Sequence, residues 1–600
     1  MTFTSARSRL LSASLCFLFI LTFSSLAGAT IQYTVLLDHP ERHLFHVTMT
    51  IPDVTDEVIV RMPAWNALYQ IRDFSSHVQQ VEAFAGPKKV SIEKVDKQTW
   101  CIKGTGTIKI TYATYWDEAG PFASQLNSEH AFINPAMILF YVPARREEEV
   151  ILSVNFSSAT WGAAGPLGDS LLVSGRNHEA GFKAPSYDAL ADGPIEVGKI
   201  DVFELSEVAP PVTVVIHGDN WRKKQVEEDL KRICQYQLKL MSGAPFERYT
   251  FLLHFGKGAG GGGMEHANST AIGAYSDEYL PSVAAHEFFH LWNVKRIRPT
   301  SLDPVDYIKE QYTRALWFVE GVTNTYGSYT LVRSGIWSKE QFYADLGEQI
   351  TELEARPANR WQSAEQSSLD AWLERYPLYN QPEYSVSYYT KGQVLGDLLD
   401  ILIRDRTGNE KSLDDVLRLM NTNFAKAGKT YRDSLDVQLT SETVAGGSFE
   451  EFFRKYVAGA DPFPYQQILA LAGLGLRTVE RRKLALGFSV EHEPSGPFVV
   501  STVDSGAPAA QTGLRAGDVI LNWNGGEVPR RVERWLQEQK AGDQLKLRVR
   551  REDKEFSLEF RLGENKEIVY EVVEVSHPGE KARHIREGML GGETRAIPVR

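Results

Sequence analysis

Cysteine is scarce in this chain, with only 3 among 600 residues. A protein of this size cannot depend on a disulfide framework with so few thiols, although Cys101 and Cys234 could still pair in an oxidising compartment. Positive charge is also in the minority, because 65 Lys and Arg stand against 77 Asp and Glu. The net charge of −12 therefore argues against nucleic acid as the default partner.

Long apolar runs are absent beyond the N-terminus, so the mature chain carries no stretch able to span a bilayer. The N-terminus itself has a charged start at Arg7 and Arg9, an apolar run over 10–26 and the small residues Ala27-Gly28-Ala29. These are the three parts of a secretory signal peptide. We expect residues 1–29 to be removed and the protein to be periplasmic or secreted. A retained single-pass anchor is the alternative.

The rest of the chain is too long for one hydrophobic core, and the spacing of its apolar residues changes along its length. Short alternating strands indicate a β-sandwich over residues 30–208, and helical spacing dominates 209–475. Strands return around one helix over 480–565, and 566–600 reads as a charged tail. We expect a multidomain α+β protein.

Two helix starts are recognisable within the helical region. Ser338 is followed by Gln341, and Ser412 by Asp415, each at the spacing of an N-terminal cap. Both should begin a helix.

The central chemistry is a metal site. His286-Glu287-Phe-Phe-His290 fits the pattern H-E-x-x-H, and residues four apart share one face of a helix. Two imidazoles can therefore bind one cation, while Glu287 accepts a proton from metal-bound water. A surface helix with two unrelated histidines is the competing interpretation, and the strongly apolar flanks disfavour it.

A catalytic zinc needs a third protein ligand and one open position. The apolar run Leu316–Gly321 contains one acid, Glu320, whose burial is costly unless it is paired or metal-bound. We predict that Glu320 completes the site for one Zn²⁺ per chain. The alternative is a buried salt bridge.

The segments His286–Pro299 and Leu316–Gly321 together resemble the M61 metallopeptidases, the glycyl aminopeptidase relatives among the gluzincins. The segments Met62–Asn66 and Ile71–Phe74 also resemble the N-terminal part of that family. The resemblance implies a thermolysin-like catalytic domain and covers nearly all of residues 31–565.

The resemblance assigns two further segments. Gly262-Gly263-Met264-Glu265 is similar to the exopeptidase segment of the related M1 aminopeptidases, which implies that Glu265 holds the free amine of a substrate. Without the family, Glu265 would read as solvated surface after a flexible glycine run. Tyr389 is similar to the tyrosine that faces the scissile carbonyl, and Tyr388 is its nearest alternative.

The leading function is thus a zinc aminopeptidase that removes small N-terminal residues from peptides with a free amino terminus. Glu287 would act as the general base and Tyr389 would stabilise the oxyanion. A thermolysin-type endopeptidase is favoured instead if Glu265 faces away from the cleft. An inactive scaffold is the third class, and the intact acid–base and metal positions disfavour it.

The C-terminal module resembles a PDZ domain through Leu486-Gly487-Phe488 and the turn Gly513–Ile520. The resemblance implies that backbone N–H groups of Leu486, Gly487 and Phe488 receive the carboxylate of a peptide C-terminus. The alternative is a PDZ domain that serves only as a structural brace.

Overall fold

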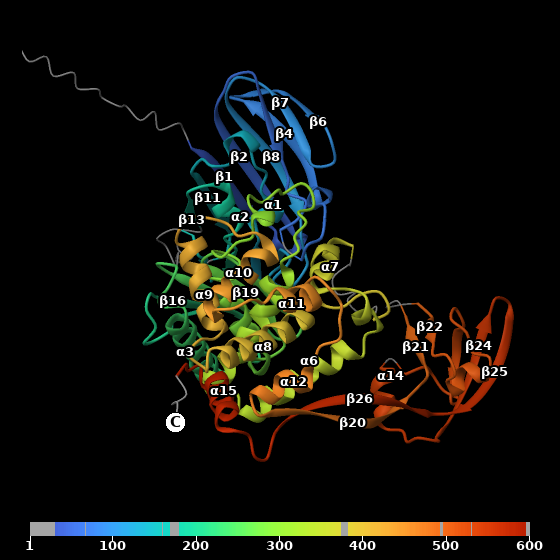
Figure 1. Ribbon diagram of the computed structural model, residues 1–600. Coiled ribbons are helices and arrows are strands. Elements are labelled where there is room, and N and C mark those ends of the chain that lie inside the picture. The colour runs from blue at the N-terminus through green and yellow to red at the C-terminus, as the bar shows by residue number, and fades with distance from the viewer. Residues whose placement is uncertain are drawn as a thin grey trace, which may run out of the picture.

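The computed structural model describes residues 30–66, 68–158, 160–167, 179–373, 382–492, 496–529 and 531–595. The expected signal peptide, residues 1–29, lies outside this range. Figure 1 shows a β-rich N-terminal region, a largely helical central body and a small β domain that projects to one side. Among the described helices, none has the length and apolar character needed to cross a membrane.

The N-terminal region is built from strands whose side chains alternate between core and surface. Its elements are β1 (Ile31–Leu37), β2 (Leu44–Val54), β3 (Glu57–Arg61), β4 (Val78–Ala85), β5 (Lys88–Lys89), β6 (Ser91–Lys94), β7 (Thr99–Lys103), β8 (Gly106–Tyr115), β9 (Gln125–Leu126), β10 (His130–Ile133), α1 (Pro135–Ile138), β11 (Val150–Phe156), β12 (Gly162–Ala164), β13 (Glu179–Ala184), α2 (Tyr187–Ala191) and β14 (Ile195–Gly198). In β1, Ile31, Tyr33, Val35 and Leu37 are buried while the residues between them are more exposed. Three sheets, β13-β11-β1-β2-β8-β4-β5, β3-β7-β6 and β12-β14-β10-β9, surround one shared core.

A five-stranded sheet underlies the central body. Its strands are β15 (Asp201–Glu204), β16 (Val212–Gly218), β17 (Tyr249–Phe255), β18 (Gly262–Glu265) and β19 (Ser269–Ala274), in the spatial order β15-β16-β17-β19-β18. β16, β17 and β19 run parallel, and β18 is an antiparallel edge strand. β15 already pairs with β16, so the central sheet takes in residues that we assigned to the N-terminal domain. The glycine-rich segment, which reads as a loop in the sequence, ends in an edge strand.

The two regions meet where the sheet β12-β14-β10-β9 packs against the five-stranded sheet through a small apolar cluster. Beside it, the buried Glu196 carboxylate bridges His130 Nδ1 at 2.7 Å and His254 Nε2 at 2.8 Å. Each contact has the length of a charge-assisted hydrogen bond and uses a different carboxylate oxygen. Burial opposes ionisation, but these two histidines hold the pKa of Glu196 down to about 2. The triad therefore links the two sheets through two buried hydrogen bonds.

Helices cover the five-stranded sheet and form the largest core of the molecule. They are α3 (Lys223–Leu240), α4 (Leu280–Phe289), α5 (Thr323–Arg333), α6 (Lys339–Glu354), α7 (Ala364–Leu369), α8 (Tyr388–Arg406), α9 (Leu413–Met420), α10 (Asp433–Ala445), α11 (Glu450–Phe452) and α12 (Tyr465–Leu471). The capping boxes at Ser338–Gln341 and Ser412–Asp415 are both present, which confirms the two predicted helix starts. α8 is buried along nearly its whole length, so it is the central helix of the body.

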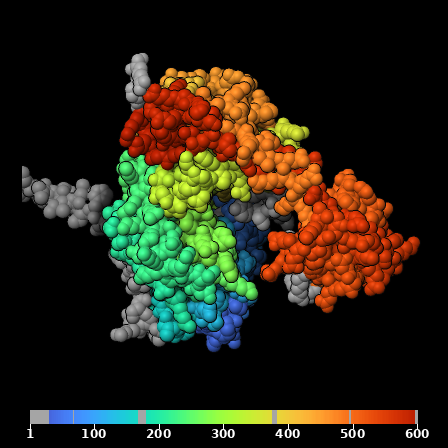
Figure 2. Space-filling view, turned by 90° about the horizontal axis from the view of Figure 1, so that it is seen from below, coloured from blue at the N-terminus to red at the C-terminus, as the bar shows by residue number. Residues whose placement is uncertain are grey.

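The PDZ region is carried on an arm. Its elements are β21 (Phe488–Glu491), β22 (Phe498–Val503), α13 (Pro508–Gln511), β23 (Val519–Trp523), α14 (Val532–Gln537), β24 (Gln544–Arg551) and β25 (Lys554–Arg561), and the arm is the two-stranded ribbon of β20 (Leu474–Ala485) and β26 (Gly563–Glu574). The five strands enclose a small core of their own. Figure 2 shows this domain projecting from one side of the body.

The segment that we expected to be a charged tail is instead structured, so that expectation is wrong. After β26 the chain forms α15 (Glu580–Gly591), which packs on the helical body. Arg333 Nε donates to the Met589 carbonyl at 2.8 Å, and Arg404 Nη1 donates to the Glu593 carbonyl at 2.9 Å. The ribbon and α15 therefore tie both ends of the PDZ arm to the body. The exposed, charged faces of the ribbon are the reason why the sequence pattern did not predict these elements.

Neither of the two described thiols takes part in a disulfide. Cys101 is buried on β7 and Cys234 is buried on α3, in different regions of the molecule. Burial raises the pKa of the Cys234 thiol well above its usual value, which keeps it protonated. The described fold therefore depends on packing rather than on cross-links.

Candidate active site

Helix α4 presents the two histidines from a buried position. Pro281 lies in its first turn, where a missing N–H costs nothing, and Ala284, Ala285 and Phe288 are fully buried. His286 and His290 lie one turn apart and point to the same side. Their Nε2 atoms are 2.9 Å apart.

Glu320 closes the triad. Its Oε2 lies 3.4 Å from His286 Nε2 and 3.2 Å from His290 Nε2. Ligand atoms bonded to a tetrahedral zinc at 2.0–2.1 Å are separated by about 3.3 Å, so the donor set and its spacing fit such an ion. The sequence-predicted ligands are thus brought together in one cluster.

The orientation of His290 is fixed from behind. Its Nδ1 lies 2.6 Å from the Asn293 carbonyl, which accepts the ring N–H and leaves Nε2 free for a cation. The Asn293 side chain in turn donates to the Phe318 carbonyl at 2.8 Å. The chain segment just before Glu320 is therefore tied directly to the residue that orients His290.

Two glycines allow the elements around Glu320 to approach closely. Glu320 lies in a π-helical segment, Trp317–Val322, that runs against α8. A Cβ at Gly321 would stand 2.4 Å from Gly392 Cα, and one at Gly392 would stand 2.1 Å from the Trp317 carbonyl oxygen. Only glycine fits at both positions, and this contact sets the N-terminal end of α8 beside the metal triad.

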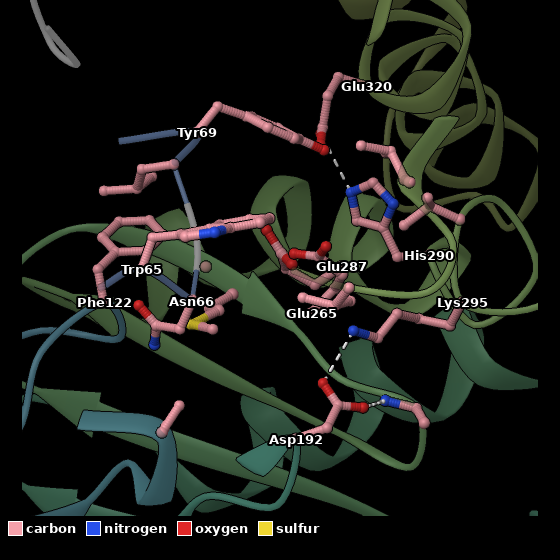
Figure 3. Close-up of a pocket in the computed structure, with 18 of the residues that line it drawn as sticks. Trp65, Asn66, Tyr69, Phe122, Asp192, Glu265, Glu287, His290, Lys295 and Glu320 are labelled. Carbon is pink, nitrogen blue, oxygen red and sulfur yellow. Dashed lines mark hydrogen bonds and ion pairs between the residues drawn. The ribbon is translucent and has the colours of Figure 1, made fainter. Parts of the chain in front are cut away.

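Glu287 lies between the metal triad and β18. A Cβ at Gly263 would stand 2.4 Å from Glu287 Oε1, so the missing side chain makes room for this carboxylate. Glu265, at the end of β18, has a carboxylate oxygen within 4.8 Å of ligand atoms of Glu287 and His290. Glu265 thus faces the cleft, as Figure 3 shows. Gly262, Gly263 and Met264 line the same cleft.

Tyr389, rather than Tyr388, lines the cleft. The Tyr389 ring centroid lies 6.1 Å from that of His286. Tyr388 is buried and stacks on Tyr389 at 4.8 Å. Ser387 caps α8 by accepting the backbone N–H groups of Tyr389 and Thr390, which fixes the start of the helix.

The electrostatics of the cluster favour a cation. Burial lowers the pKa of His286, which keeps this imidazole neutral. Burial also raises the pKa of Glu287 well above its usual value. Burial by itself would lower the pKa of His290. The carboxylates of Glu320, Glu265 and Glu287 instead raise this pKa to about 10. A divalent ion would replace this proton and satisfy the surrounding negative charge.

The N-terminal region supplies a wall of the cleft, which the sequence did not reveal. Trp65, Tyr69, Phe122 and Asp192 line the cavity of about 700 Å³ together with the metal triad. Asp192 Oδ1 accepts from Lys295 Nζ at 2.8 Å, a pair seen at the bottom of Figure 3. Trp65 follows the Met-Pro-Ala motif of the N-terminal segment, so that motif was the one available signal.

The PDZ region has a groove between β21 and α14. Leu486, Phe488 and Val490 form one side, and Val532 and Leu536 form the other. Leu486 and Phe488 are largely buried beneath it. The predicted carboxylate-binding loop therefore lies along this groove, which Leu486 and Phe488 line.

Comparison with known protein families now bears on this geometry. Residues 280–395 match the M61 glycyl aminopeptidase domain, residues 32–199 match the M61 N-terminal domain, and residues 484–562 match a PDZ domain. The chain thus carries a region similar to the M61 peptidase domain, preceded by a region similar to the M61 N-terminal domain. The predicted resemblance to M61 peptidases, the multidomain α+β fold and the peptide-hydrolysing enzyme class are thereby confirmed. A comparison with curated proteins gives no match.

Solved structures extend the comparison. An aminopeptidase N family protein from Idiomarina loihiensis is 25% identical with a TM-score of 0.81, covering 94% of this chain and 100% of its own. An M1 zinc metallopeptidase from Deinococcus radiodurans is 13% identical with a TM-score of 0.45, covering 72% of this chain and 94% of its own. The first of these likenesses extends over nearly the whole of this chain.

Proposed function

We propose that this protein is a zinc-dependent aminopeptidase, with one zinc ion per chain, that removes small residues of the Gly or Ala type from free N-termini. The observation that carries this proposal is the position of Glu265. Its carboxylate lies within 4.8 Å of ligand atoms of Glu287 and His290. A carboxylate so close to the proton-transfer group can hold the ammonium of a substrate only one residue away from the scissile bond.

The residues divide the chemistry among them. His286, His290 and Glu320 would hold the zinc, which when bound supplies a Lewis acid that polarises a carbonyl and makes water a stronger acid. Glu287 accepts the proton of the attacking water and passes it to the leaving amine. The Tyr389 hydroxyl donates a hydrogen bond to the developing oxyanion.

The other two function classes have less support. An endopeptidase of the thermolysin type is favoured if Glu265 faces away from the cleft, whereas the Glu265 carboxylate lines the cleft beside Glu287. An inactive scaffold would not require a clustered metal triad with a buried base beside it. The aminopeptidase accounts for every group in the cluster.

The deciding experiment compares free and N-acetylated peptides. A peptide beginning with Ala should be cut one residue at a time, whereas its acetylated twin should not be cut. Charge-assisted hydrogen bonds are worth roughly 1.5–3 kcal/mol, so Glu265→Gln should lower kcat/KM by about one to two powers of ten. Bound zinc should not change. Equal cleavage of acetylated and free peptides would refute the proposal.

A matched control is available at an exposed glutamate outside the cleft. Glu278 is exposed on the turn before α4, so Glu278→Gln removes the same charge without entering the cleft. This variant should keep the kcat/KM of the unaltered enzyme. A comparable loss in both variants would trace the effect to net charge instead of to amine recognition.

Two further assignments belong to the same proposal. The PDZ groove would receive the C-terminal carboxylate of a peptide at Leu486-Gly487-Phe488, with its last apolar side chain on Val532 and Leu536. The charged and apolar parts of residues 1–29 support export to the periplasm or the exterior.

A further inference from the structure

Several large apolar side chains are exposed on the central body, in segments that hydrogen bonds hold close to one another. Trp361 is 57% exposed, Leu373 80%, Tyr384 67% and Tyr312 55%. With the partly exposed Trp372, these five residues form what we call the apolar patch. Soluble proteins seldom expose large contiguous apolar surface unless it binds something.

Hydrogen bonds hold the segments of the patch side by side. The Ala358 amide donates to the Pro382 carbonyl at 3.1 Å, and the Val386 amide donates to Gln362 Oε1 at 2.8 Å, so the Trp361 and Tyr384 segments adjoin. Gln362 Nε2 also donates to Asp370 Oδ2 at 3.2 Å, next to the Trp372 turn. These bonds bring the stretches of chain that carry Trp361, Trp372 and Tyr384 next to one another.

Trp372 and Tyr312 complete this surface. Trp372 Nε1 donates to the Gln311 carbonyl at 2.9 Å. The Trp372 and Tyr312 rings lie 6.4 Å apart between centroids. The side chains of Tyr312 and Trp372 are thus held close to one another, and Leu373 follows Trp372 in the chain.

The apolar patch is continuous with the rim of the active-site cleft. The Trp372 ring meets Trp65 edge-on at 5.1 Å and Tyr69 at 5.9 Å, and both of these residues line the cleft. On the other side, Tyr384 lies just before α8, whose first turn carries Tyr389. The patch thus starts where the cleft ends.

The direction of the substrate follows from the order of groups along the cleft. Glu265 clusters with Glu287 and His290, whereas Tyr389 lies beside His286. A substrate with its amine at Glu265 and its carbonyl facing Tyr389 sends its remaining residues out at the Tyr389 end. That end leads onto the apolar patch.

We infer that the apolar patch binds apolar side chains downstream of the scissile bond, so that the preferred substrates are extended oligopeptides rather than dipeptides. This inference rests on the proposed aminopeptidase function. Tryptophan and tyrosine rings suit the task, since they offer large contact areas with few rotatable bonds. α7, between Trp361 and Trp372 in the sequence, lies on the side of the body toward the PDZ domain (Figure 1). A longer peptide would leave in that direction.

The test uses two peptides of equal length that share their first two residues. Ala-Ala-Leu-Phe-Leu-Phe-Ser places apolar side chains over the patch, and Ala-Ala-Ser-Gln-Ser-Gln-Ser places polar ones there. We expect kcat/KM to be about tenfold higher for the apolar peptide, mainly through KM, because a few buried apolar contacts carry such a difference. Equal values for the two peptides would overturn the inference.

The matched variants separate recognition from folding. Trp361→Ser combined with Tyr384→Ser should remove most of the preference for the apolar peptide and leave the polar peptide unaffected. Leu435→Ser, at an exposed apolar position on α10, should leave the preference intact. A double variant that slows both peptides equally would show a structural role and overturn the inference. The inference would also be overturned if the unaltered enzyme sedimented as a dimer, the double variant sedimented as a monomer, and the enzyme showed no preference between the two peptides.

The dipeptide Ala-Ala distinguishes this inference from the proposed function. Cleavage of the free dipeptide without any preference between the heptapeptides refutes only the role of the patch. Cleavage of the N-acetylated heptapeptides at the rate of the free ones refutes the aminopeptidase itself. The two failures have different signatures in one set of assays.

Discussion

Gly263→Ala is the substitution whose consequence the geometry fixes most sharply. The added Cβ would stand 2.4 Å from Glu287 Oε1 and Cγ and 2.5 Å from its Cδ, whereas ordinary contact begins at 3.4 Å. The carboxylate must therefore move by about 1 Å, which it can do by rotating its flexible side chain. Stability should change little, since Gly263 does not have a positive φ. The cost should fall on the position of the general base.

A displacement of about 1 Å in a catalytic group costs on the order of 100-fold in rate, or about 2.7 kcal/mol in the activation barrier. We therefore expect Gly263→Ala to lower kcat about 100-fold on an N-terminal Ala peptide, with bound zinc and the thermal midpoint nearly unchanged. Steady-state kinetics, elemental analysis and a thermal melt measure the three quantities.

Gly261→Ala is the matched control within the same glycine run. A Cβ at Gly261 meets nothing within 4 Å, and its φ is not positive either. This variant should keep its kcat. Full activity in Gly263→Ala would refute the placement of Glu287 against β18, and equal losses in both variants would show that the glycine run acts through flexibility.

Three other outcomes follow from the same structure. His286→Ala should lose both zinc and activity, and zinc retained in this variant would disprove the site. Glu287→Gln should keep stoichiometric zinc by elemental analysis and lose turnover, because Glu287 is a base and not a ligand. Glu196→Gln should cost about 3 kcal/mol in urea unfolding, since it breaks a buried ion pair. Because the folded-state pKa of Glu196 is lowered from 4.5 to about 2, its stabilisation is complete above pH 4.5 and is lost as the pH falls toward 2; a pH-independent difference would contradict this. Amino-terminal sequencing of the exported protein should find Thr30 as its first residue, and a start at Met1 would contradict signal cleavage.

The metal centre illustrates how local spacing specifies chemistry. Two histidines four residues apart must share a helix face, and the base between them must then lie beside the same cation. Nothing beyond α4 is needed for that conclusion, so His286, Glu287 and His290 could be predicted together. The capping boxes of α6 and α9 were predictable for the same reason, since cap and partner are three residues apart.

The rest of the site depends on contacts across the chain. Whether Tyr388 or Tyr389 faces the cleft is set by the start of α8 and by the Gly321–Gly392 approach, which joins segments far apart in sequence. Adjacent tyrosines have the same local propensity, so the sequence favoured one of them only through a family resemblance.

The sequence by itself determined what local periodicity and spacing can encode: the strand-rich and helical regions and the helix that carries two metal ligands. The PDZ domain was recognisable from the sequence through its resemblance to a known domain family. Tertiary structure alone decided that the N-terminal region walls the cleft, that Glu265 faces Glu287, and that 566–595 returns to the body as β26 and α15. The apolar patch belongs to the second group as well. The physical reason is that these features depend on packing distances between distant segments, and those distances leave no repeating pattern in the chain.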